Sequence, residues 1–348
     1  MLSLNWEQHD PAFNLALEEV LFDALSPALP GIFLLWRNRP SIIIGRHQNA
    51  FAEINAGWCR AHGIHIVRRS TGGGAVYHDL GNLNFSFLLW SGHSRILEPA
   101  RFLTPVLDAL RDVGVEAACS SRNDLSAGGR KIAGTALRRD GQRTLLHGCI
   151  LVHTDTSALT QALAGDPEKF LSKGVSSHKA RVANLCDLLP SANTCTGESL
   201  NDAAAEPAEV MRRLMDALTR HCAHGVFTLP DELRASASRL AKTKYRSHDW
   251  TWGRSPRFSQ KFRRRFPWGR LECFWNVREG VIQECRLLGD FFALRDPAEL
   301  EAHFLGLAPD AHALRAALEP LGVEAWFSGA EREPLLSFLC GEDSEAKP

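Results

Sequence analysis

A glycine-rich stretch beside two arginines is the first place where this sequence could do chemistry. "RRSTGGGAVYHDLGNLNFSF" (residues 68–87) places Arg68 and Arg69 shortly before three glycines at 72–74. Glycine tolerates positive φ and lets another group approach the backbone closely. Consecutive N–H groups in such a turn form an anion-binding concavity, and an arginine adds a fork for phosphate or carboxylate. The stretch predicts a phosphate or adenylate cradle, and the alternative is a tight turn between two strands.

Two common nucleotide motifs do not describe this stretch. It contains no G-x-x-x-x-G-K-[ST] sequence, so it is not a Walker A loop. The residues after Gly74 have strand character rather than helix character, so the context of a dinucleotide-binding G-x-G-x-x-G turn is missing.

A second candidate stretch is "SRNDLSAGGRKIAGTALRR" (residues 121–139). Lys131 follows a glycine pair, begins a predicted strand and precedes small residues, so a ligand can lie close to it. Its ammonium group could neutralise a carboxylate or phosphate during acyl transfer. Asn123 and Asp124 offer hard oxygen ligands of the kind that Mg²⁺ prefers. The alternative is a surface lysine after a hairpin turn.

Composition narrows the class of protein. The 348 residues suit two domains, and the formal net charge of +0 gives no overall attraction to nucleic acid or membrane. No apolar run approaches the roughly 20 residues of a membrane span, and the N-terminus lacks a signal-peptide layout. Nine cysteines without a C-x-x-C pair argue against a disulfide framework or zinc site. We therefore expect a cytoplasmic protein.

Hydrophobic periodicity predicts the elements that would position these residues. Residues 12–25 combine helical spacing of apolar side chains with acids on the opposite side, and an Asp-Gly pair predicts a turn near residue 141. We expect helices at 12–25, 99–113, 206–223, 230–242, 297–306 and 311–320, strands at 31–36, 41–45, 64–69, 75–79, 83–90, 131–139 and 144–153, and a hairpin over 269–292.

The order of these elements predicts the fold class. Helices alternate irregularly with short hairpins, which favours an α+β fold with a mixed or antiparallel sheet over a doubly wound fold. The aromatic, basic stretch at 244–260 is weakly periodic and is interpreted as a linker. We predict a catalytic domain at residues 1–245, a linker at 246–255 and a small α+β accessory domain at 256–348.

Several stretches taken together resemble the lipoate–protein ligase A family of the biotin/lipoate ligase superfamily. The glycine stretch, "RNDL" followed by "GRKIAGTA", and "KGVSSHKARVANL" (173–185) carry the resemblance. "DPAFNLALEE" (10–19) and "WRNRPSIIIGRHQNAF" (36–51) fit the same pattern. The motifs run in order along residues 4–190, and "WTWGRSPRF" (250–258) resembles the family's interdomain segment.

This resemblance implies a biotin/lipoate ligase-like catalytic domain and a reaction in two steps. The family activates lipoate with ATP, which carries Mg²⁺, to lipoyl-AMP and then transfers the lipoyl group to an acceptor lysine. The implied partners are the lipoyl domains of 2-oxoacid dehydrogenase E2 subunits and the glycine cleavage H protein. No nucleic acid or membrane partner is expected.

The resemblance also assigns roles to single residues. Lys131 matches the catalytic lysine that contacts both lipoate and nucleotide, and Arg69, Gly73 and Gly74 would bind lipoate with it. Residues 166–183 resemble the adenylate-binding loop, and we expect 168–181 to be mobile until adenylate orders it. The implied ATP-binding residues are Arg69, Gly74, Ala75, Val76, Tyr77, Lys131, Lys179 and Arg181, and Asp124 is the candidate Mg²⁺ ligand.

Two further parts of the site have candidates only. The dithiolane tail needs an apolar slot, and "IFLLW" (32–36), "SIIIG" (41–45) and "FSF" (85–87) could line it or simply form core. In the second step the acceptor lysine attacks the acyl-AMP carbonyl, so no protein nucleophile is required. Asp124 and His147 are the candidate general bases.

Cys119 supports the main alternative function. Octanoyltransferases of the same superfamily use a cysteine nucleophile and no ATP, and a nearby cation such as Lys131 would assist the thiolate. The other interpretation is a small buried residue at a strand end. The intact "RNDL" and adenylate-loop motifs favour the ligase. A transferase that uses only preformed lipoyl-AMP and a non-enzymatic cofactor-binding module are the remaining alternatives.

Two other features have ordinary interpretations. His78 and His147 lack metal-ligand spacing, and His78 is expected to be a hydrogen-bonding strand residue. "KFRRRF" (261–266) could meet an acidic acceptor domain, but a solvated basic face is favoured.

Overall fold

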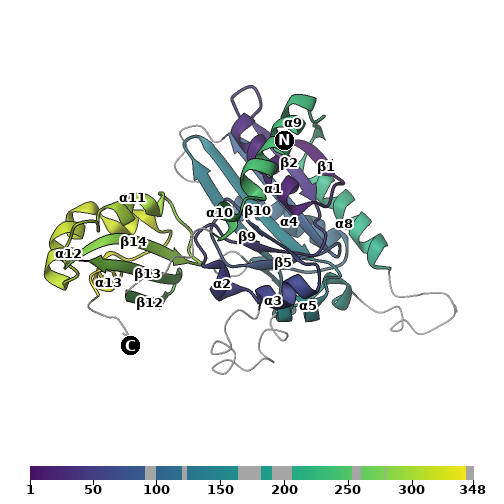
Figure 1. The fold of residues 1–348 in the computed structure, drawn as a ribbon. Helices are drawn as coiled ribbons and strands as arrows, with labels where there is room; N and C mark the ends of the chain where they lie inside the picture. The colour runs from purple at the N-terminus through teal and green to yellow at the C-terminus, as the bar shows by residue number, and fades with distance from the viewer. Residues whose placement is uncertain are drawn as a thin grey trace, which may run out of the picture. The chain divides into compact units, whose positions relative to one another are not determined.

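The chain forms two compact units in the computed structural model (Figure 1). The first contains residues 1–43, 54–67 and 76–247, and the second contains residues 44–53, 68–75 and 248–348. Residues 68–75, which include the three glycines, therefore belong to the same unit as the C-terminal residues, whereas residues 76–87 belong to the first unit. The predicted boundaries at 245 and 256 stay a prediction. The structure describes residues 1–90, 99–119, 124–163, 182–189, 206–252, 260–278 and 280–341.

The first unit is built on an eight-stranded sheet with the order β11-β1-β2-β6-β10-β9-β8-β7. Strands β11, β1 and β2 are parallel, and every later neighbour is antiparallel. The predicted α+β class with a mixed sheet is thereby confirmed. The strands are β1 (Leu2–Trp6), β2 (Gly31–Trp36), β6 (Asn82–Trp90), β7 (Ala118–Cys119), β8 (Asp124–Ala127), β9 (Arg130–Asp140), β10 (Arg143–Leu151) and β11 (Gly225–Val226).

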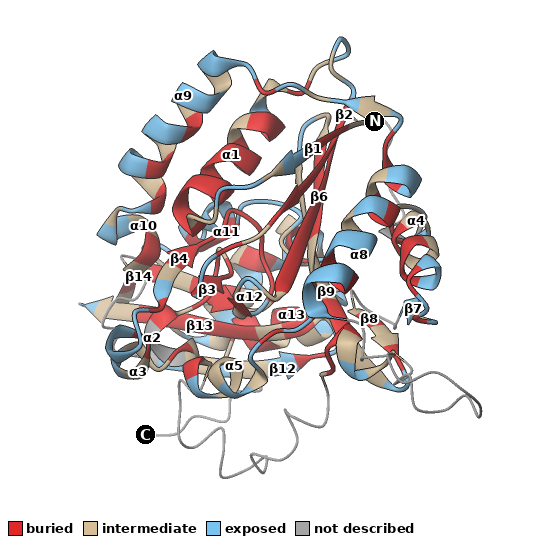
Figure 2. Ribbon diagram, turned by 90° about the vertical axis from the view of Figure 1, so that its right-hand side faces the viewer, coloured by how far each residue is buried: buried red, intermediate tan, exposed pale blue. Residues whose placement is uncertain are grey.

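Helices cover both faces of this sheet. Figure 2 shows α1 (Pro11–Ala24) and α9 (Asp231–Leu240) on one side, and α4 (Pro99–Asp112) and α8 (Pro207–Cys222) on the other. The side facing α4 and α8 is apolar, and it includes Leu83, Phe85 and Phe87 of β6. Helix α1 begins with Pro11, and the Asp10 side chain accepts a hydrogen bond from the Ala12 N–H at 3.2 Å.

The first unit also contains a smaller sheet and several short helical segments. Strands β3 (Ser41–Ile44), β4 (His65–Arg68) and β5 (Val76–His78) pair in the order β4-β3-β5, and their last residues Ile44 and Arg68 belong to the second unit. His78 shares a hydrogen bond of 3.1 Å with Asn38, as predicted for a strand residue. The helical segments include α3 (Ala56–Ala61), α5 (Thr156–Ala162) and a π-helix, Ala241–Tyr245.

The second unit contains a three-stranded antiparallel sheet in the order β12-β13-β14. Its apolar face packs against helices through residues that include Leu271, Trp275 and Leu336. This confirms the α+β character predicted for the C-terminal part. The elements are α2 (Ala50–Glu53), α10 (His248–Trp252), β12 (Gln260–Phe266), β13 (Gly269–Arg278), β14 (Val281–Gly289), α11 (Pro297–Ala302), α12 (Ala311–Leu318) and α13 (Arg332–Leu339).

The stretch at 244–260 contains the end of the π-helix and α10, and Tyr245 is buried there. Its role as a linker stays a prediction. The stretch "KFRRRF" is edge strand β12, which was not predicted. Lys261, Arg263 and Arg265 alternate along it and are exposed, in agreement with a solvated basic face. Within the described residues, no helix is long and apolar enough to cross a membrane.

Arg68 holds the second unit together at the base of the glycine stretch. Its side chain is fully buried and donates hydrogen bonds of 2.7–3.2 Å to several backbone carbonyls. The acceptors lie in two segments far apart in sequence, 45–48 and 250–251. One guanidinium therefore satisfies polar backbone groups that burial would otherwise leave unpaired.

Replacing Arg68 with methionine should destabilise the second unit. The change keeps much of the side-chain volume but leaves several buried carbonyls without a donor. We expect the free energy of unfolding to fall by about 3 kcal/mol, measured by urea denaturation. The matched control is Arg263→Met, since Arg263 is exposed on β12. Equal stability of the two variants would contradict the role given to Arg68.

Candidate functional site

The glycine stretch is shaped by close contacts inside the second unit. A Cβ atom on Gly72 would lie 2.5 Å from the carbonyl oxygen of Phe291, and Gly73 has a φ of +87°. The Gly73 N–H donates to the same Phe291 oxygen at 3.2 Å. A Cβ on Gly74, in contrast, would meet no described atom within 4 Å. Packing therefore requires Gly72 and conformation requires Gly73, while Gly74 leaves its backbone open to an incoming group.

Arg69 supports the same stretch from within. The residue is buried, and its guanidinium donates to Thr71 Oγ1 at 2.9 Å and to the carbonyl of Gly74 at 2.8 Å. It also donates to the Gly72 carbonyl. These bonds fix the loop and keep a positive charge beside it. Direct contact of Arg69 with ATP or lipoate stays a prediction.

Lys131 lies at the start of β9 in the first unit and is paired with Asp124 of β8. The ammonium nitrogen is 2.8 Å from Asp124 Oδ1, and both side chains are partly exposed. A Cβ on Gly134 would lie only 3.0 Å from Lys131 Nζ, so the lysine folds over the gap that this glycine leaves. The arrangement places a positive charge directly on the face of the sheet. Such a charge can stabilise an approaching carboxylate or phosphate.

The register of the sheet places Asp124, the partner of Lys131, at one end of a row of residues that crosses five strands. Asp124 lies opposite Gly134, Gly134 opposite Cys149, Cys149 opposite Asn84, and Asn84 opposite Trp36. Opposite residues in an antiparallel ladder share one face of the sheet. This row therefore faces the side of the sheet that α1 covers, away from the apolar core under α4 and α8.

His147, one of the two candidate general bases, lies on the same face in a buried polar chain. Its Nδ1 atom is 2.9 Å from Oε1 of Glu18, a residue of α1 that is 1% exposed. The Ser86 hydroxyl donates to the same carboxylate at 2.6 Å, and Trp36 Nε1 donates to Ser86 at 3.0 Å. The chain fixes the orientation of the imidazole ring. Glu18 could not be recognised from sequence spacing, because its partners lie 68 and 129 residues away.

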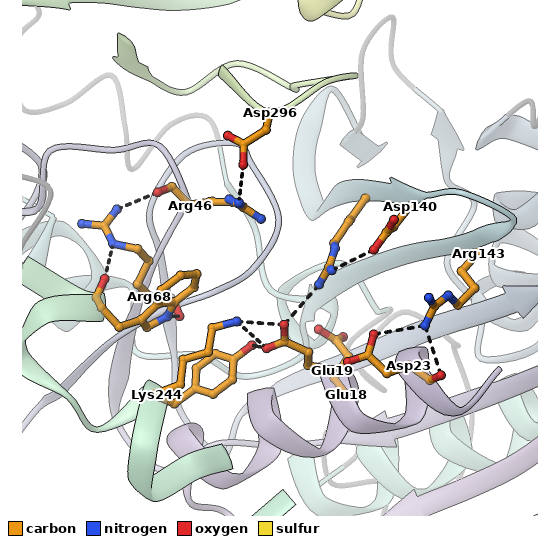
Figure 3. A network of polar contacts seen from close by, with 12 residues as sticks. Glu18, Glu19, Asp23, Arg46, Arg68, Asp140, Arg143, Lys244 and Asp296 are labelled. Atoms are coloured by element: carbon orange, nitrogen blue, oxygen red, sulfur yellow. Dashed lines mark hydrogen bonds and ion pairs between the residues drawn. The ribbon is translucent and has the colours of Figure 1, made fainter. Parts of the chain in front are cut away.

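Glu19, the next residue of α1, joins three elements of the first unit through one carboxylate (Figure 3). It accepts hydrogen bonds from Lys244 Nζ at 2.7 Å and from the Tyr245 hydroxyl at 2.6 Å, and Arg138 of β9 lies 3.4 Å away. Burial acts to raise the pKa of Glu19, but the charge of Lys244 and the hydrogen bonds together lower it below its usual value of 4.5. The π-helix is thereby fixed to α1.

The remaining predicted nucleotide residues follow the glycines into β5. Ala75 and Val76 are half-buried, and Tyr77 is buried. Burial raises the pKa of Tyr77 to about 12, with smaller contributions from Asp79 and Asp155. Tyr77 is therefore a neutral residue at physiological pH. Its contact with ATP stays a prediction.

The structure does not favour Cys119 as a nucleophile. It ends the short strand β7 and is exposed, so the expectation that it would be a buried residue was wrong. Partial burial of the thiol raises its pKa, and no cation is found to lower it among the described residues. A nucleophilic cysteine needs a lowered pKa to be a thiolate at neutral pH.

Several predicted residues lie outside the described part of the chain. These are Asn123, Lys179 and Arg181, together with residues 168–181, the part of the adenylate loop predicted to be mobile. Among the described residues, no group of three His, Cys, Asp or Glu side chains could hold a metal ion. Asp124, the candidate Mg²⁺ ligand, is engaged by Lys131.

Two family models match the chain. The lipoyl protein ligase A/B catalytic domain matches residues 10–217, and the bacterial lipoate protein ligase C-terminus matches residues 255–339. Lipoate–protein ligase 1 of Staphylococcus aureus is 34% identical over 330 residues, which cover 95% of this chain and 97% of that protein.

Solved structures agree with these matches. A bipartite lipoate protein ligase of Thermoplasma acidophilum, described with its E2 lipoyl domain, is 30% identical with a TM-score of 0.62. The comparison covers 74% of this chain and 98% of that one. A lipoate–protein ligase A bound with ATP is 28% identical with a TM-score of 0.59, and covers 72% of this chain and 98% of that one.

The Glu19 cluster predicts a pH-dependent contribution to stability. Because the pKa of Glu19 is lowered in the folded state, its contribution is present above the unfolded pKa, near 4.5, and is lost as pH falls through the folded pKa. At pH 7 we expect Glu19→Gln to lower the free energy of unfolding by about 3 kcal/mol, measured by urea denaturation. The difference from the unchanged protein should shrink below pH 4.5.

Glu209→Gln is the matched control, because Glu209 is exposed and pairs with Arg212 on the surface of α8. That variant should behave like the unchanged protein at pH 7. A stability difference for Glu19→Gln that stays constant from pH 7 to pH 3.5 would contradict the assignment.

Proposed function

The chain belongs to the lipoate–protein ligase family, whose members are ligases, and from that membership we propose that it activates lipoate with ATP and transfers the lipoyl group to a lysine of an acceptor domain. The observation that carries this proposal is the Lys131 ammonium group held by Asp124 over Gly134. The ATP-bound relative supports ATP as the activating substrate.

The first step joins two anions. An oxygen of the lipoate carboxylate attacks the α-phosphorus of ATP, the bond to the β-phosphate bridge breaks, and pyrophosphate leaves. Lys131 would hold the carboxylate and the α-phosphate together and stabilise the charge of the transition state. The nucleotide would be bound by the exposed backbone of Gly74, by the Arg69 side chain and by residues Ala75 to Tyr77. Lys179 and Arg181 are proposed to contact its phosphate.

The second step needs only a neutral amine and a leaving group. The acceptor lysine attacks the acyl-AMP carbonyl, an amide bond forms, AMP leaves with the electrons of the broken C–O bond, and the amine loses a proton. Asp124 is a candidate to take that proton, because it lies beside Lys131 on the exposed end of the row. His147 is less suited, since Glu18 and burial confine it.

The described residues do not fit a protein-built Mg²⁺ site. Asp124 is one carboxylate whose oxygen is occupied by an ammonium group at 2.8 Å, and a cation there would be repelled by Lys131. We propose that Mg²⁺ arrives bound to the ATP phosphates, and no step depends on a protein ligand to it.

The proposed acceptors are lipoyl domains of E2 subunits and the glycine cleavage H protein. The Thermoplasma relative, described with its E2 lipoyl domain, supports the first of these. We further propose that residues 1–245 act as the catalytic domain, with 246–255 as a linker and 256–348 as an accessory domain. No disulfide joins the cysteines of the described residues, which suits action in the cytoplasm.

Mass spectrometry of an apo lipoyl domain would test the function directly. With this protein and lipoate, the domain should gain one lipoyl group only when Mg²⁺-ATP is present. Lys131→Ala should keep the fold but lower pyrophosphate release by about a hundredfold or more, because transition-state charge is no longer stabilised. The control is Arg130→Ala, which removes the neighbouring charge instead.

Three other outcomes would each revise the proposal. A mass gain from supplied lipoyl-AMP but not from ATP indicates a transferase that lacks activation. A gain from an octanoyl carrier protein without ATP, lost in Cys119→Ala, indicates an octanoyltransferase. Near-normal pyrophosphate release by Lys131→Ala would remove Lys131 from the mechanism.

A further inference from the structure

Two buried asparagines of β6 carry side-chain atoms that have no hydrogen-bond partner among the described protein atoms. Asn82 is 0% exposed, and neither its Oδ1 nor its Nδ2 atom is paired. Asn84 is 1% exposed, and its Nδ2 atom is unpaired. Successive even-numbered residues of a strand share a face, so both carboxamides lie on the side that carries the row from Asp124 to Trp36.

Such burial is unfavourable and therefore needs a reason. A buried polar group without a partner costs about 1–3 kcal/mol, and most native buried groups avoid that cost. Two other buried polar residues of the same unit, Ser86 and Asn184, avoid it. Ser86, two residues along the strand, donates to Glu18 and accepts from Trp36. Asn184 accepts from the Thr154 N–H at 2.9 Å and donates to the Thr154 carbonyl at 3.1 Å.

The position of the pair points to a polar ligand. Asn84 lies opposite Cys149, which lies opposite Gly134, so two strand spacings separate Asn84 from the position that Lys131 covers. Two spacings amount to about 10 Å. Cys149 between them is small and half-buried, and Gly134 has no side chain. Lys131 and Asn84 thus bracket a stretch of sheet with little side-chain bulk.

We propose that the Asn82 and Asn84 carboxamides contact the substrate and hold the polar part of the acyl-adenylate on this face, with Lys131 at the other side. The inference rests on the proposed function and adds two substrate-binding residues to it. The Nδ2 groups donate to acceptor oxygens, first of the lipoate carboxylate and then of the acyl phosphate. The Asn82 Oδ1 atom accepts from a donor such as a ribose hydroxyl. Both carboxamides stay neutral, so they orient these oxygens without competing with Lys131 for charge.

Replacement by leucine, which has nearly the same shape, separates this role from a structural one. Because no protein partner is lost, Asn82→Leu and Asn84→Leu should leave the thermal midpoint of the free protein unchanged or raised. The same change at Asn184 should lower the midpoint, since it breaks two hydrogen bonds. In the steady state, we expect kcat/KM for lipoate to fall about tenfold for Asn84→Leu.

The decisive readout is the rise in thermal midpoint on adding preformed lipoyl-AMP. It should be clear for the unchanged protein and much smaller for Asn82→Leu and Asn84→Leu. Variants that lose stability but keep kcat/KM and the lipoyl-AMP shift would overturn the proposal, because the asparagines would then be structural. Unchanged stability, kcat/KM and shift would overturn it as well.

Failure of the proposed function would give a different pattern. If the unchanged protein forms no lipoyl-AMP from ATP but is stabilised by supplied lipoyl-AMP, activation is refuted while the asparagine pair is still tested by the shift. If lipoyl-AMP does not stabilise the unchanged protein, both the acyl-adenylate site and the proposed role of the asparagines are refuted.

Discussion

The first unit depends on one constraint, the two-residue period of strand β6 at the centre of its sheet. Leu83, Phe85 and Phe87 face α4 and α8 and form core, so the residues between them must face α1. Those residues are Asn84 and Ser86, and Asn82 precedes them on the same face. A shift of register by one residue would place every polar group in the core, so the apolar side fixes where the polar side lies. This packing therefore determines which face of the sheet carries the candidate site.

When a helix covers a polar face of a sheet, its side chains must supply hydrogen-bond partners for the buried polar groups. Helix α1 does so with adjacent carboxylates that point to different partners. Glu18 accepts from Ser86 and contacts His147, whereas Glu19 binds Lys244, Tyr245 and Arg138. Breaking one member of a buried charged group leaves the others unpaired in low dielectric, which is the costly case. These contacts therefore fix α1, β9 and the π-helix as one rigid support around the row.

Local pattern was sufficient for part of this picture. Alternation located β6, the Asp-Gly turn located the β9–β10 hairpin, and small residues after Lys131 indicated an open strand surface, which Gly134 supplies. Strand β12 was missed because its three consecutive arginines, Arg263 to Arg265, interrupt the alternation of apolar and polar residues. Glu18 and Glu19 were missed because their partners lie 68 to 226 residues away, and register alone decides which of them meet. Sequence spacing carries no information about such contacts.

The glycine stretch meets two separate requirements, the proposed anion binding and close packing. Anion binding explains why backbone should be bare, but it does not explain why Gly72 in particular lacks a side chain. The carbonyl of Phe291 does, since a Cβ there would lie 2.5 Å away. Arg68 adds a second tie between the base of the stretch and residues 250–251. The shape of a loop near residue 70 is therefore set by residues beyond 250, so any ligand that binds its N–H groups depends on correct folding of the C-terminal residues.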